Sequence, residues 1–587
     1  MEWRKGIWLA AWASFALFGQ NGEELFRRHC DGCHGPAGTV RAPKIESLRG
    51  MSAAAVRTAM DSGSMREMSA ALTPEQRATV ANWLGAGAAQ EAPGWKQSCA
   101  PGVEPHTDSS FWNGWGVDPE NSRFQPAAMA GLSAADLPHL KLKWAFRFPG
   151  VNATVSQPAL VGGRLYMGSA DGTVYSLDAA TGCVYWTFHA DAMVRTAVTI
   201  GANRHAKYAV YFGDTKAQVY SLDAKTGTLG WKTKVDDHAG ARITAAPALY
   251  GGRLYVPVSS FEEASAAKLS YPCCTFRGSV AAIDNESGKI DWKTYTIPQA
   301  PKPLGKNPGG TPSHGPSGAA VWSTPTLDLD KRLLYAATGN GYSGPAASTT
   351  DAVLALEMDT GRLVWSQQLL ADDGWNFSCV MGGGQNCPKK AGPDFDIGAS
   401  PILRKLPGGK RVLLIGQKSG IVHALDPDAR GAVLWRTRVG EGSALGGIEW
   451  GMGADAEAVY VPVSDQLTKR PGGLAALRLT DGSKLWRIDG ATPECGGRRP
   501  CNAAQQAAPT LLPGVVLSGS MDGKLRAHST RDGALLWSFD TLTQPGGGAI
   551  NVYSAIAAQG MLIVPSGYGL LGGLPGNVVL TFTVDGR

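Results

Sequence analysis

Residues 171–186, DGTVYSLDAATGCVYW, recur in variant form down most of the 587-residue chain. Each copy predicts an apolar strand, a tight turn carried by Asp and Gly, and a short second strand that ends in Trp, which is typical of a β-hairpin. A hairpin of this length cannot bury its own apolar face, so the copies must stack on one another. The further copies lie at 220–231, 281–292, 354–365, 423–435, 475–486 and 526–537.

Additional strands precede most of these hairpins, for example at 158–172, 247–260 and 509–523, which gives the four strands of a propeller blade. Trp144 ends an eighth copy that lacks its preceding strands. Those strands are found at the other end of the chain, at 560–586. A last blade built from both ends would close the ring and remove its sheet edges. The sequence therefore predicts an all-β, eight-bladed propeller over residues 111–587.

Composition and the first residues limit the cellular setting. The 55 Lys and Arg against 49 Asp and Glu leave a formal charge of +6, too dilute over this length to indicate nucleic acid as a partner. Arg4 and Lys5 precede an apolar run, which predicts a signal peptide at 1–18, with an uncleaved anchor as the alternative. We expect a periplasmic or secreted protein without stable membrane insertion after cleavage.

Ten cysteines in an exported chain favour disulfides. The sequence suggests three bridges between separated cysteines, each of which would fasten a loop or an entry segment to the propeller. These pairs are Cys379–Cys387, Cys495–Cys501 and Cys99–Cys183.

A c-type haem attachment motif lies near the start of the chain. In HCDGCHG, Cys30 and Cys33 supply two thiols for thioether bonds and His34 supplies the proximal iron ligand. A zinc site would need a second ligand pair, and none is visible nearby. The following segment resembles the cytochrome c pattern in which a Met ligand precedes the last helix. That spacing indicates Met65 as the sixth ligand, with Met68 as the alternative.

The last helix of this unit has a clear beginning. Thr73 at the N-cap, Pro74 at the first position and Gln76 three residues after the cap form a capping-box pattern. We therefore expect a small all-α cytochrome c domain over residues 19–90. A linker at 91–110 would join it to the propeller.

A haem domain joined to a ring of Trp-ended repeats resembles the quinohaemoprotein alcohol dehydrogenases, whose propeller holds pyrroloquinoline quinone (PQQ) and Ca²⁺. The order of the domains and the segments 112–125, 273–284 and 392–403 resemble the cytochrome-containing polyvinyl-alcohol dehydrogenases. This resemblance implies PQQ, haem c and Ca²⁺ as cofactors. It also implies oxidation of a secondary alcohol, small or carried on a polymer, with electrons passing from reduced PQQ to haem and on to an external acceptor such as a soluble cytochrome.

One insertion into the repeat, residues 259–278, joins two acids to two adjacent cysteines. Neighbouring Cα atoms lie about 3.8 Å apart across a trans peptide, below the usual disulfide range of about 4.4 Å or more, so a Cys273–Cys274 bridge would be strained. Such strain tends to persist at ligand sites. The resemblance implies that this pair stacks on PQQ, although the related enzymes carry it in another blade. It also implies Glu262 or Glu263 as a Ca²⁺ ligand, and we favour Glu263.

Five further residues take cofactor roles from the resemblance. Trp322 would stack on the quinone plane, and Asn340, in a TGN turn, would bind Ca²⁺ through its side-chain carbonyl. Lys418 would contact the adjacent quinone oxygens and stabilise charge that develops on reduction. Arg195 and Arg242 occupy like points of two blades and would hold PQQ carboxylates, because Arg suits bidentate contacts.

A base must accept the hydroxyl proton of the alcohol. Related enzymes use an Asp in a stretch where this chain has Asn376, and an amide cannot accept that proton. We therefore predict Asp394 as the base, with Asp396 beside it as a Ca²⁺ ligand or second acid and Asp373 as the alternative base. Trp450 would form a wall of the substrate funnel.

A second hypothesis is a non-enzymatic exported propeller scaffold that carries an electron-transferring cytochrome c domain, because fold alone does not determine function. The two hypotheses differ in where Glu263, Asn340, Asp394 and Lys418 lie. A dehydrogenase needs these groups around one cavity on the ring axis, and a scaffold does not.

Overall fold

The computed structural model describes most of the chain. The predicted signal peptide lies outside the described residues, as does the predicted linker apart from residues 98–100. The described residues are 21–36, 38, 42–49, 51–61, 65–66, 68–85, 98–100, 111–380 and 384–587.

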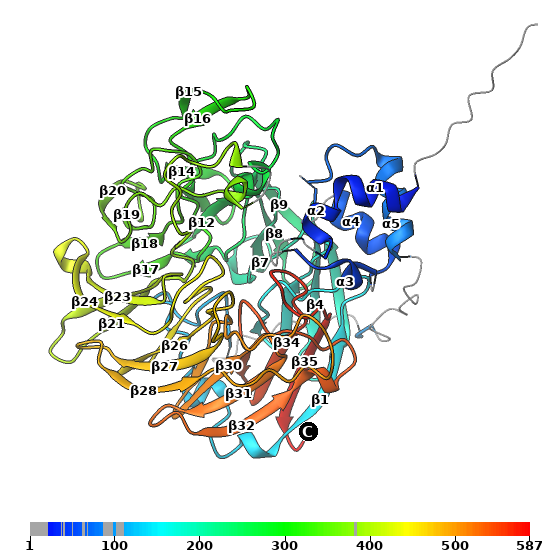
Figure 1. The fold of residues 1–587 in the computed structure, drawn as a ribbon. Helices are drawn as coiled ribbons and strands as arrows, with labels where there is room; N and C mark the ends of the chain where they lie inside the picture. The colour runs from blue at the N-terminus through cyan, green and yellow to red at the C-terminus, as the bar shows by residue number, and fades with distance from the viewer. Residues whose placement is uncertain are drawn as a thin grey trace, which may run out of the picture.

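Five short helices form the N-terminal unit beside the propeller (Figure 1). The Asn21 side chain accepts the N–H of Glu24 at 2.8 Å and so begins the first helix. The predicted capping box begins the last one, because Thr73 and Gln76 exchange backbone-to-side-chain hydrogen bonds of 2.9 and 3.2 Å. The helices are α1 (Gly22–His29), α2 (Asp31–His34), α3 (Ile45–Arg49), α4 (Ala53–Asp61) and α5 (Pro74–Gly85).

The rest of the described chain forms eight antiparallel sheets arranged as blades around an axis, which confirms the predicted propeller. The first four blades comprise β2 (Ala159–Val161), β3 (Arg164–Gly168), β4 (Thr173–Asp178) and β5 (Val184–His189); β6 (Thr199–Asn203), β7 (Lys207–Gly213), β8 (Gln218–Asp223) and β9 (Leu229–Lys234); β10 (Ala241–Arg242), β11 (Ala248–Tyr250), β12 (Arg253–Ser260), β13 (Ser279–Asp284) and β14 (Ile290–Tyr295); and β17 (Thr326–Asp328), β18 (Leu333–Ala337), β19 (Ala352–Glu357) and β20 (Leu363–Gln368).

The other four blades comprise β21 (Ile402–Lys405), β22 (Arg411–Gly416), β23 (Ile421–Asp426) and β24 (Ala432–Arg438); β25 (Gly453–Ala454), β26 (Ala458–Pro462), β27 (Gly473–Arg478) and β28 (Lys484–Asp489); β29 (Thr510–Leu512), β30 (Val515–Gly519), β31 (Lys524–Ser529) and β32 (Leu535–Asp540); and β33 (Ile556–Ala558), β34 (Met561–Ser566), β35 (Val578–Val584) and β1 (Leu140–Arg147).

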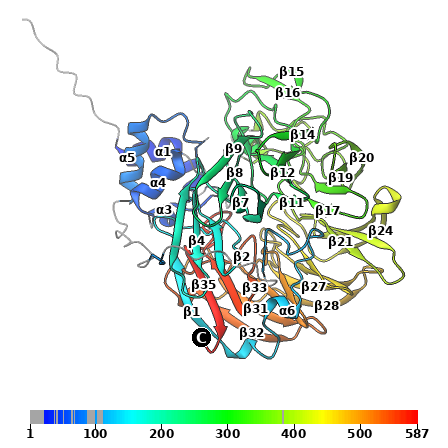
Figure 2. The same ribbon diagram turned by 180° about the vertical axis from the view of Figure 1, so that it is seen from behind.

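The last of these blades closes the ring with strands from both ends of the propeller (Figures 1 and 2). Its order is β1, β35, β34, β33, and β1 runs antiparallel to β35 from the pair Leu140 and Val584 to the pair Arg147 and Val578. The strand from the start of the propeller thus completes the last blade and joins the two ends of the ring. The expectation drawn from Trp144 and the C-terminal strands is therefore confirmed.

The repeated Trp and Gly explain how neighbouring blades are joined. Trp186 donates its indole N–H to the carbonyl of Ala224 in the next blade at 3.1 Å. A Cβ placed on Gly227, in the next hairpin turn, would come within 2.6 Å of the Trp186 ring, and this glycine also has a φ of 75°. Only glycine fits both the close approach and the left-handed turn. The same pairing recurs at Trp144 with Gly182 and at Trp435 with Gly482.

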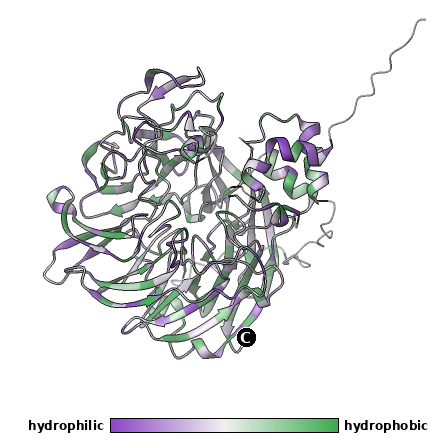
Figure 3. Cartoon of the chain, viewed as in Figure 1, coloured by the Kyte–Doolittle hydropathy of each residue, from purple (hydrophilic) through white to green (hydrophobic). Residues whose placement is uncertain are grey.

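Remaining elements lie in the loops between strands. The outer hairpin formed by β15 and β16 is largely exposed and hydrophilic, in contrast with the apolar strands inside the blades (Figure 3). Within the described residues, no helix is long and apolar enough to cross a membrane. These elements are α6 (Ala127–Ala130), α7 (Glu262–Ser265), β15 (Lys302–Lys306), β16 (Pro312–Gly315), η1 (Leu137–His139), η2 (Phe377–Cys379), η4 (Pro427–Ala429) and η5 (Thr541–Thr543).

Four disulfides form among the described cysteines, and they include the three predicted pairs of separated cysteines. Cα atoms of these three pairs lie 5.2 Å apart in Cys99–Cys183, 4.7 Å in Cys379–Cys387 and 5.8 Å in Cys495–Cys501. The fourth joins the adjacent Cys273 and Cys274. Cys99–Cys183 fastens the segment before the propeller to its first blade.

Candidate active site

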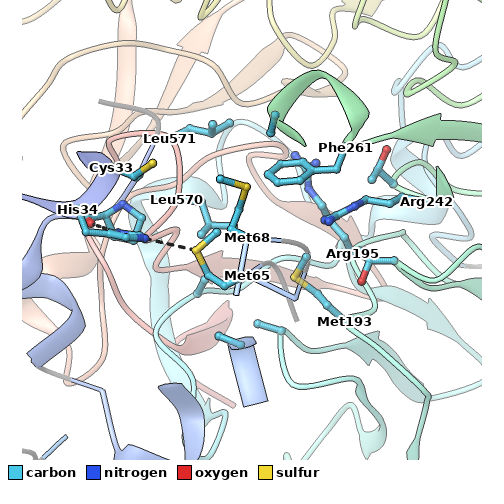
Figure 4. A pocket seen from close by; sticks show the side chains of 18 of the residues that line it. Cys33, His34, Met65, Met68, Met193, Arg195, Arg242, Phe261, Leu570 and Leu571 are labelled. Carbon is cyan, nitrogen blue, oxygen red and sulfur yellow. Dashed lines mark hydrogen bonds between the residues drawn. The ribbon is translucent and has the colours of Figure 1, made fainter. Parts of the chain in front are cut away.

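A single cavity of about 380 Å³ extends from the helical unit to the propeller axis (Figure 4). Its lining includes the haem-attachment residues at one end and residues from loops of several blades at the other. The helical unit contacts the propeller beside this cavity, where Arg66 donates to the Ala239 carbonyl at 3.3 Å. A haem and a quinone held by these residues would therefore lie in one continuous cavity.

At the haem end of the cavity, the two residues predicted as iron ligands face each other. His34 Nε2 lies 3.3 Å from Met65 Sδ, and His34 Nδ1 donates to the Pro43 carbonyl at 2.7 Å. This second bond fixes the tautomer that leaves Nε2 available to a metal. Cys30 and Cys33 are outside any disulfide, so both sulfurs are available for thioether bonds.

The surroundings of this pair fit a haem. Burial is the main cause that lowers the pKa of His34, which favours the neutral imidazole that binds iron. Met68 also lines the cavity, on the propeller side of Met65 (Figure 4). The other walls at this end are apolar and comprise Phe26, Leu48, Met51, Val56, Met60, Leu72, Val80 and Leu84.

At the axis, one lysine lies between two buried carboxylates. Lys418 Nζ donates to Asp396 Oδ2 at 3.0 Å and to Asp394 Oδ1 at 3.3 Å. Asp396 lines the cavity, whereas Asp394 is completely buried and is not part of the described lining. The D-x-D spacing thus places both acids on the lysine but gives only Asp396 access to the cavity.

Asp373 lies behind this pair and holds its backbone. Its carboxylate accepts the N–H groups of Asp394 at 3.1 Å and Phe395 at 2.7 Å, and Asp394 has a φ of 62°. Burial is the first cause that raises the pKa of Asp373 from its ordinary 3.8 to about 6, followed among the charges by Asp396 and Asp394. Because it lies outside the lining, Asp373 contacts the acid segment and not the cavity.

The TGN turn lies against Asp396. The backbone N–H of Asn340 donates to Asp396 Oδ1 at 2.6 Å, and a Cβ on Gly339 would come within 2.9 Å of the same oxygen. Asn340 Nδ2 donates to the carbonyls of Trp375 at 2.8 Å and Gly341 at 3.2 Å. These donations orient the amide, so that its carbonyl oxygen is the atom that remains for a cation in the cavity.

Two adjacent glutamates divide their roles. Glu262 is fully buried and accepts hydrogen bonds from Tyr271 Oη at 2.9 Å and from the N–H groups of Thr275 and Phe276, both at 2.8 Å. These contacts fasten the cysteine-containing loop. Glu263 instead lines the cavity, which supports the choice of Glu263 over Glu262 as a cation ligand.

The adjacent cysteines form a disulfide, but they do not line the cavity. Cys273 and Cys274 are buried in an apolar cluster with Phe276 and Tyr342. The predicted stacking of this pair on a quinone therefore has no support among the described lining residues. Asn376 donates to the Tyr342 carbonyl at 2.9 Å, which gives it a structural role in the same region.

Aromatic side chains enclose the charged group. The Trp322 ring lies 5.3 Å from Lys418 Nζ, and it meets the Trp450 ring edge-on with centroids 5.2 Å apart. A Cβ on Gly398 would come within 1.9 Å of Trp322, so only glycine lets the acid-bearing segment lie against this ring. All three predicted residues therefore meet at the cavity.

Both predicted arginines also line the cavity. Arg195 lies over the Trp450 ring, 4.6 Å from its centroid, and donates to Tyr568 Oη at 3.1 Å. Arg242 lies 4.1 Å from the centroid of the Phe261 ring. Two guanidinium groups in the lining give this wall positive charge, which suits an anionic ligand.

Several residues of the site gave no signal in the sequence. Met193, Phe261, Tyr568, Leu570 and Leu571 line the cavity from loops that follow no repeat. A Gly-flanked Tyr at 568 is the one feature that marks an unusual turn. The contacts that bring these residues together cross blades, which no local spacing reveals.

Fold and site together define a quinoprotein-type propeller joined to a c-type cytochrome. Three family models match the chain: "Glucose/ethanol/alcohol dehydrogenase, beta-propeller domain" at residues 112–381, "Outer membrane protein assembly factor BamB" at 401–586, and "Cytochrome C oxidase, cbb3-type, subunit III" at 19–84. Two solved quinohemoprotein alcohol dehydrogenases share the fold. The ADHIIG enzyme of Pseudomonas putida HK5 has a TM-score of 0.63 at 19% identity, covering 81% of each chain, and the Comamonas testosteroni enzyme has 0.62 at 20%, covering 82% of this chain and 81% of that one.

Curated relatives identify the family. A polyvinylalcohol dehydrogenase of Pseudomonas sp is 41% identical over 97% of this chain and 94% of that protein. Another from Sphingopyxis sp. (strain 113P3) is 38% identical over 97% and 93%. The chain belongs to the polyvinylalcohol dehydrogenase family and is a PQQ-dependent alcohol dehydrogenase with a c-type cytochrome. The scaffold hypothesis is therefore set aside.

Proposed function

We propose that the protein is an exported, periplasmic enzyme that oxidises secondary alcohols, including polyvinyl alcohol, and delivers the electrons to a soluble cytochrome. The observation that carries this proposal is the shared cavity, which has Glu263, Asn340, Asp396 and Lys418 in its lining at one end and the haem ligands at the other. The names of the two most extensive curated relatives support the polymeric substrate.

Asp396 is the proposed base. It is the carboxylate of the D-x-D pair that lines the cavity, and Lys418 Nζ donates to it at 3.0 Å. Asp396 accepts the hydroxyl proton of the alcohol at a carboxylate oxygen. Asp394, predicted from the sequence, then serves to position Lys418, and Asp373 positions the acid segment.

PQQ held by these residues would supply a two-electron acceptor for the hydride of the alcohol and a source of single electrons for the haem. Lys418 supplies a cation where charge develops, and Trp322 covers one face of the site. Arg195 and Arg242, which also line the cavity, would bind the carboxylates of PQQ. Trp450 closes the side from which the alcohol enters.

A hard divalent cation of the Ca²⁺ type would be held by Glu263, Asn340 and Asp396. The described residues contain no group of three or more His, Cys, Asp or Glu side chains in metal-binding arrangement. The donor set therefore combines two carboxylates with the oriented Asn340 carbonyl, and oxygen donors of this kind suit Ca²⁺.

The test is reconstitution of the purified haem protein with PQQ and Ca²⁺, with haem reduction followed on adding polyvinyl alcohol or 4-heptanol. We expect D396N to lower turnover about 10³-fold, within the range of general-base removal, and D394N to lower it about tenfold. Bound PQQ should remain detectable in both variants. Haem reduction that is independent of PQQ and alcohol would contradict the proposal, and a larger effect of D394N would restore Asp394 as the base.

The iron ligand has a separate test. We expect M65L to lose the absorption feature of Met-ligated ferric haem and to lower the haem potential, because a thioether ligand raises it. M68L is the matched control and should retain both properties. The opposite result would assign the iron to Met68.

A further inference from the structure

Four buried polar side chains form a continuous hydrogen-bonded chain beside the cavity. Trp450 Nε1 donates to Asn551 Oδ1 at 2.8 Å, and Asn551 Nδ2 donates to Gln506 Oε1 at 2.7 Å. Gln506 Nε2 donates to Gln466 Oε1 at 2.7 Å. Gln466 Nε2 then donates to the backbone carbonyl of Leu571 at 2.9 Å. All four side chains are buried, and every bond runs in one direction from Trp450 to Leu571.

This amide chain, defined as Trp450, Asn551, Gln506 and Gln466, crosses three blades. Its members come from loops before β25, between β26 and β27, before β29 and before β33, and it ends in the loop between β34 and β35. Gln506 Nε2 also contacts the Leu445 carbonyl at 3.1 Å. Because each amide is oriented by the next, the chain fixes the spacing of these loops more strictly than apolar packing alone.

The end point of the chain is an unusual residue. Leu571 has a φ of 51°, a left-handed conformation that is costly for a bulky side chain. Gln466 holds its carbonyl in this conformation, and the side chain lines the cavity with Leu570. Both leucines pack against the apolar cluster that contains Trp450, Met193 and Tyr568 (Figure 4).

The two ends of the amide chain thus lie on the same cavity. Trp450 and Leu571 present carbon surface to it, while the amides behind them have their donors and acceptors turned to one another. A wall of this kind offers no hydrogen bond to a ligand and favours hydrocarbon. A strained, over-determined backbone at such a point is typical of a functional constraint.

We propose that Leu571 and Trp450 form an apolar cavity wall that selects for the aliphatic chain of the alcohol, and that Gln466, Gln506 and Asn551 are positioning residues for this wall. The substrate class is a secondary alcohol with alkyl carbons on both sides of the carbinol. This inference rests on the proposed alcohol oxidation and adds the residues that set its specificity.

The first test removes the wall and keeps the backbone. L571G suits the existing φ because glycine adopts the left-handed region freely, so the hydrogen bond from Gln466 is retained. In the reconstituted holoenzyme we expect kcat/KM for 4-heptanol to fall about tenfold to 100-fold, mainly through KM, within the range for lost apolar contacts in a pocket. With 2-propanol, kcat/KM should change by less than about twofold. L571A is a second variant. It retains a Cβ, so its kcat/KM for 4-heptanol should lie between those of L571G and the wild type.

The second test asks whether Gln466 acts through Leu571. Q466E keeps the oxygen that accepts from Gln506 but loses the donor to the Leu571 carbonyl, so we expect a rise in KM for 4-heptanol of about fivefold with kcat unchanged. In a double-mutant cycle, Q466E combined with L571G should resemble L571G alone. Independent, additive effects would assign Gln466 a general structural role.

The outcomes separate this inference from the function on which it rests. A wild-type holoenzyme that oxidises neither alcohol overturns the proposed function, and the wall falls with it. A wild-type enzyme that oxidises both, while L571G changes the two equally or not at all, overturns the wall and leaves the proposed function standing. Equal kcat/KM values for 4-heptanol and 2-propanol in the wild type also overturn the wall.

Discussion

The two sides of the propeller cavity are built from different chemistry. On the charged side, Lys418 contacts Asp394 and Asp396, with Asp373 and Asp351 buried nearby. On the other side, the amide chain from Trp450 to Leu571 is neutral and completely hydrogen-bonded. Charged side chains respond to protons and cations, whereas oriented amides do not. The charged side is therefore suited to catalysis, and the amide side to selecting substrates by their shape.

Among the described residues of the charged side, Lys418 is the only cation. Its removal should have the largest effect. We expect K418M to lower turnover by about 10² to 10³, because charge that develops on reduction loses its partner. It should also lower the free energy of unfolding by about 3 to 5 kcal/mol, since two buried carboxylates lose their ammonium partner. Single-turnover haem reduction and urea unfolding measure the two effects. K418R keeps the charge and should retain more of the turnover and of the free energy of unfolding than K418M. Losses in K418R equal to those in K418M would contradict the electrostatic explanation.

Breaking the amide side should change binding more than chemistry. We expect Q506L to raise KM for 4-heptanol about tenfold, with kcat within about twofold, because the wall moves but the acids do not. The free energy of unfolding should fall by about 2 kcal/mol, since Gln466, Asn551 and the Leu445 carbonyl lose a buried partner. Steady-state kinetics across pH 6 to 9 would show the same ratio to wild type throughout. A pH-dependent ratio would remove the distinction between the two sides.

Asp373 should make the charged side sensitive to pH. Burial raises its pKa from 3.8 to about 6, so the folded protein binds a proton that the unfolded chain releases, and stability falls as pH rises from about 4 to about 6. Protonation of Asp373 below pH 6 weakens the hydrogen bonds that it accepts from the backbone N–H groups of Asp394 and Phe395. Turnover should therefore decline severalfold below pH 6. D373N should flatten this acid limb in a pH profile of kcat. An unchanged limb would assign it to another acid.

The smallest effect is expected at Asp351. Both of its buried carboxylate oxygens lack a hydrogen-bond partner among the described residues. Burial raises its pKa well above 3.8, with Asp396, Asp373 and Asp394 as further causes, so folding takes up a proton and its contribution to stability is lost as pH rises above about 4. D351N should therefore be more stable than wild type at pH 8 by about 1 kcal/mol, with the difference vanishing near pH 4. Urea unfolding at the two pH values decides this, and a loss of stability at pH 8 would contradict it.

The fold and the haem motif could be predicted because they depend on short, repeated spacings. Each repeated Trp packs against the Gly of the next hairpin turn, and the stacking of such units predicts the ring. His34 and Met65 follow from a motif and a helix start. The haem side of the molecule therefore needed no long-range information.

The charged side was partly predictable, because acids, Asn340 and Lys418 interrupt an otherwise apolar repeat. The order within the D-x-D pair was not, since both acids contact Lys418 and only the path of the segment, set by Asp373 and by Gly398 against Trp322, decides which of them lines the cavity. The sequence indicated Asp394 as the base, whereas the cavity favours Asp396. The Cys273–Cys274 bridge was expected from adjacency, but its distance from the cavity depends on the Glu262 contacts.

The amide side could not be predicted at all. Gln466, Gln506 and Asn551 are ordinary loop residues in the sequence, and no spacing links them. Their partners lie in neighbouring blades, so the pattern exists only once the ring is assembled. Local sequence patterns predict a single blade. The residues proposed to select the shape of the substrate come together only through contacts between blades.

The cavity depends on β35, the last strand, although β35 does not line it, because β35 pairs with β1 in the blade that closes the ring. None of residues 578–584 belongs to the described cavity lining, yet they pair with β1 at one flank and β34 at the other. During synthesis, the acids, the amides and the haem-facing loops can reach their final spacing only after this segment has been made and has docked. A chain shortened by those few residues would possess every reactive group and still lack the closed ring that gathers them at one cavity.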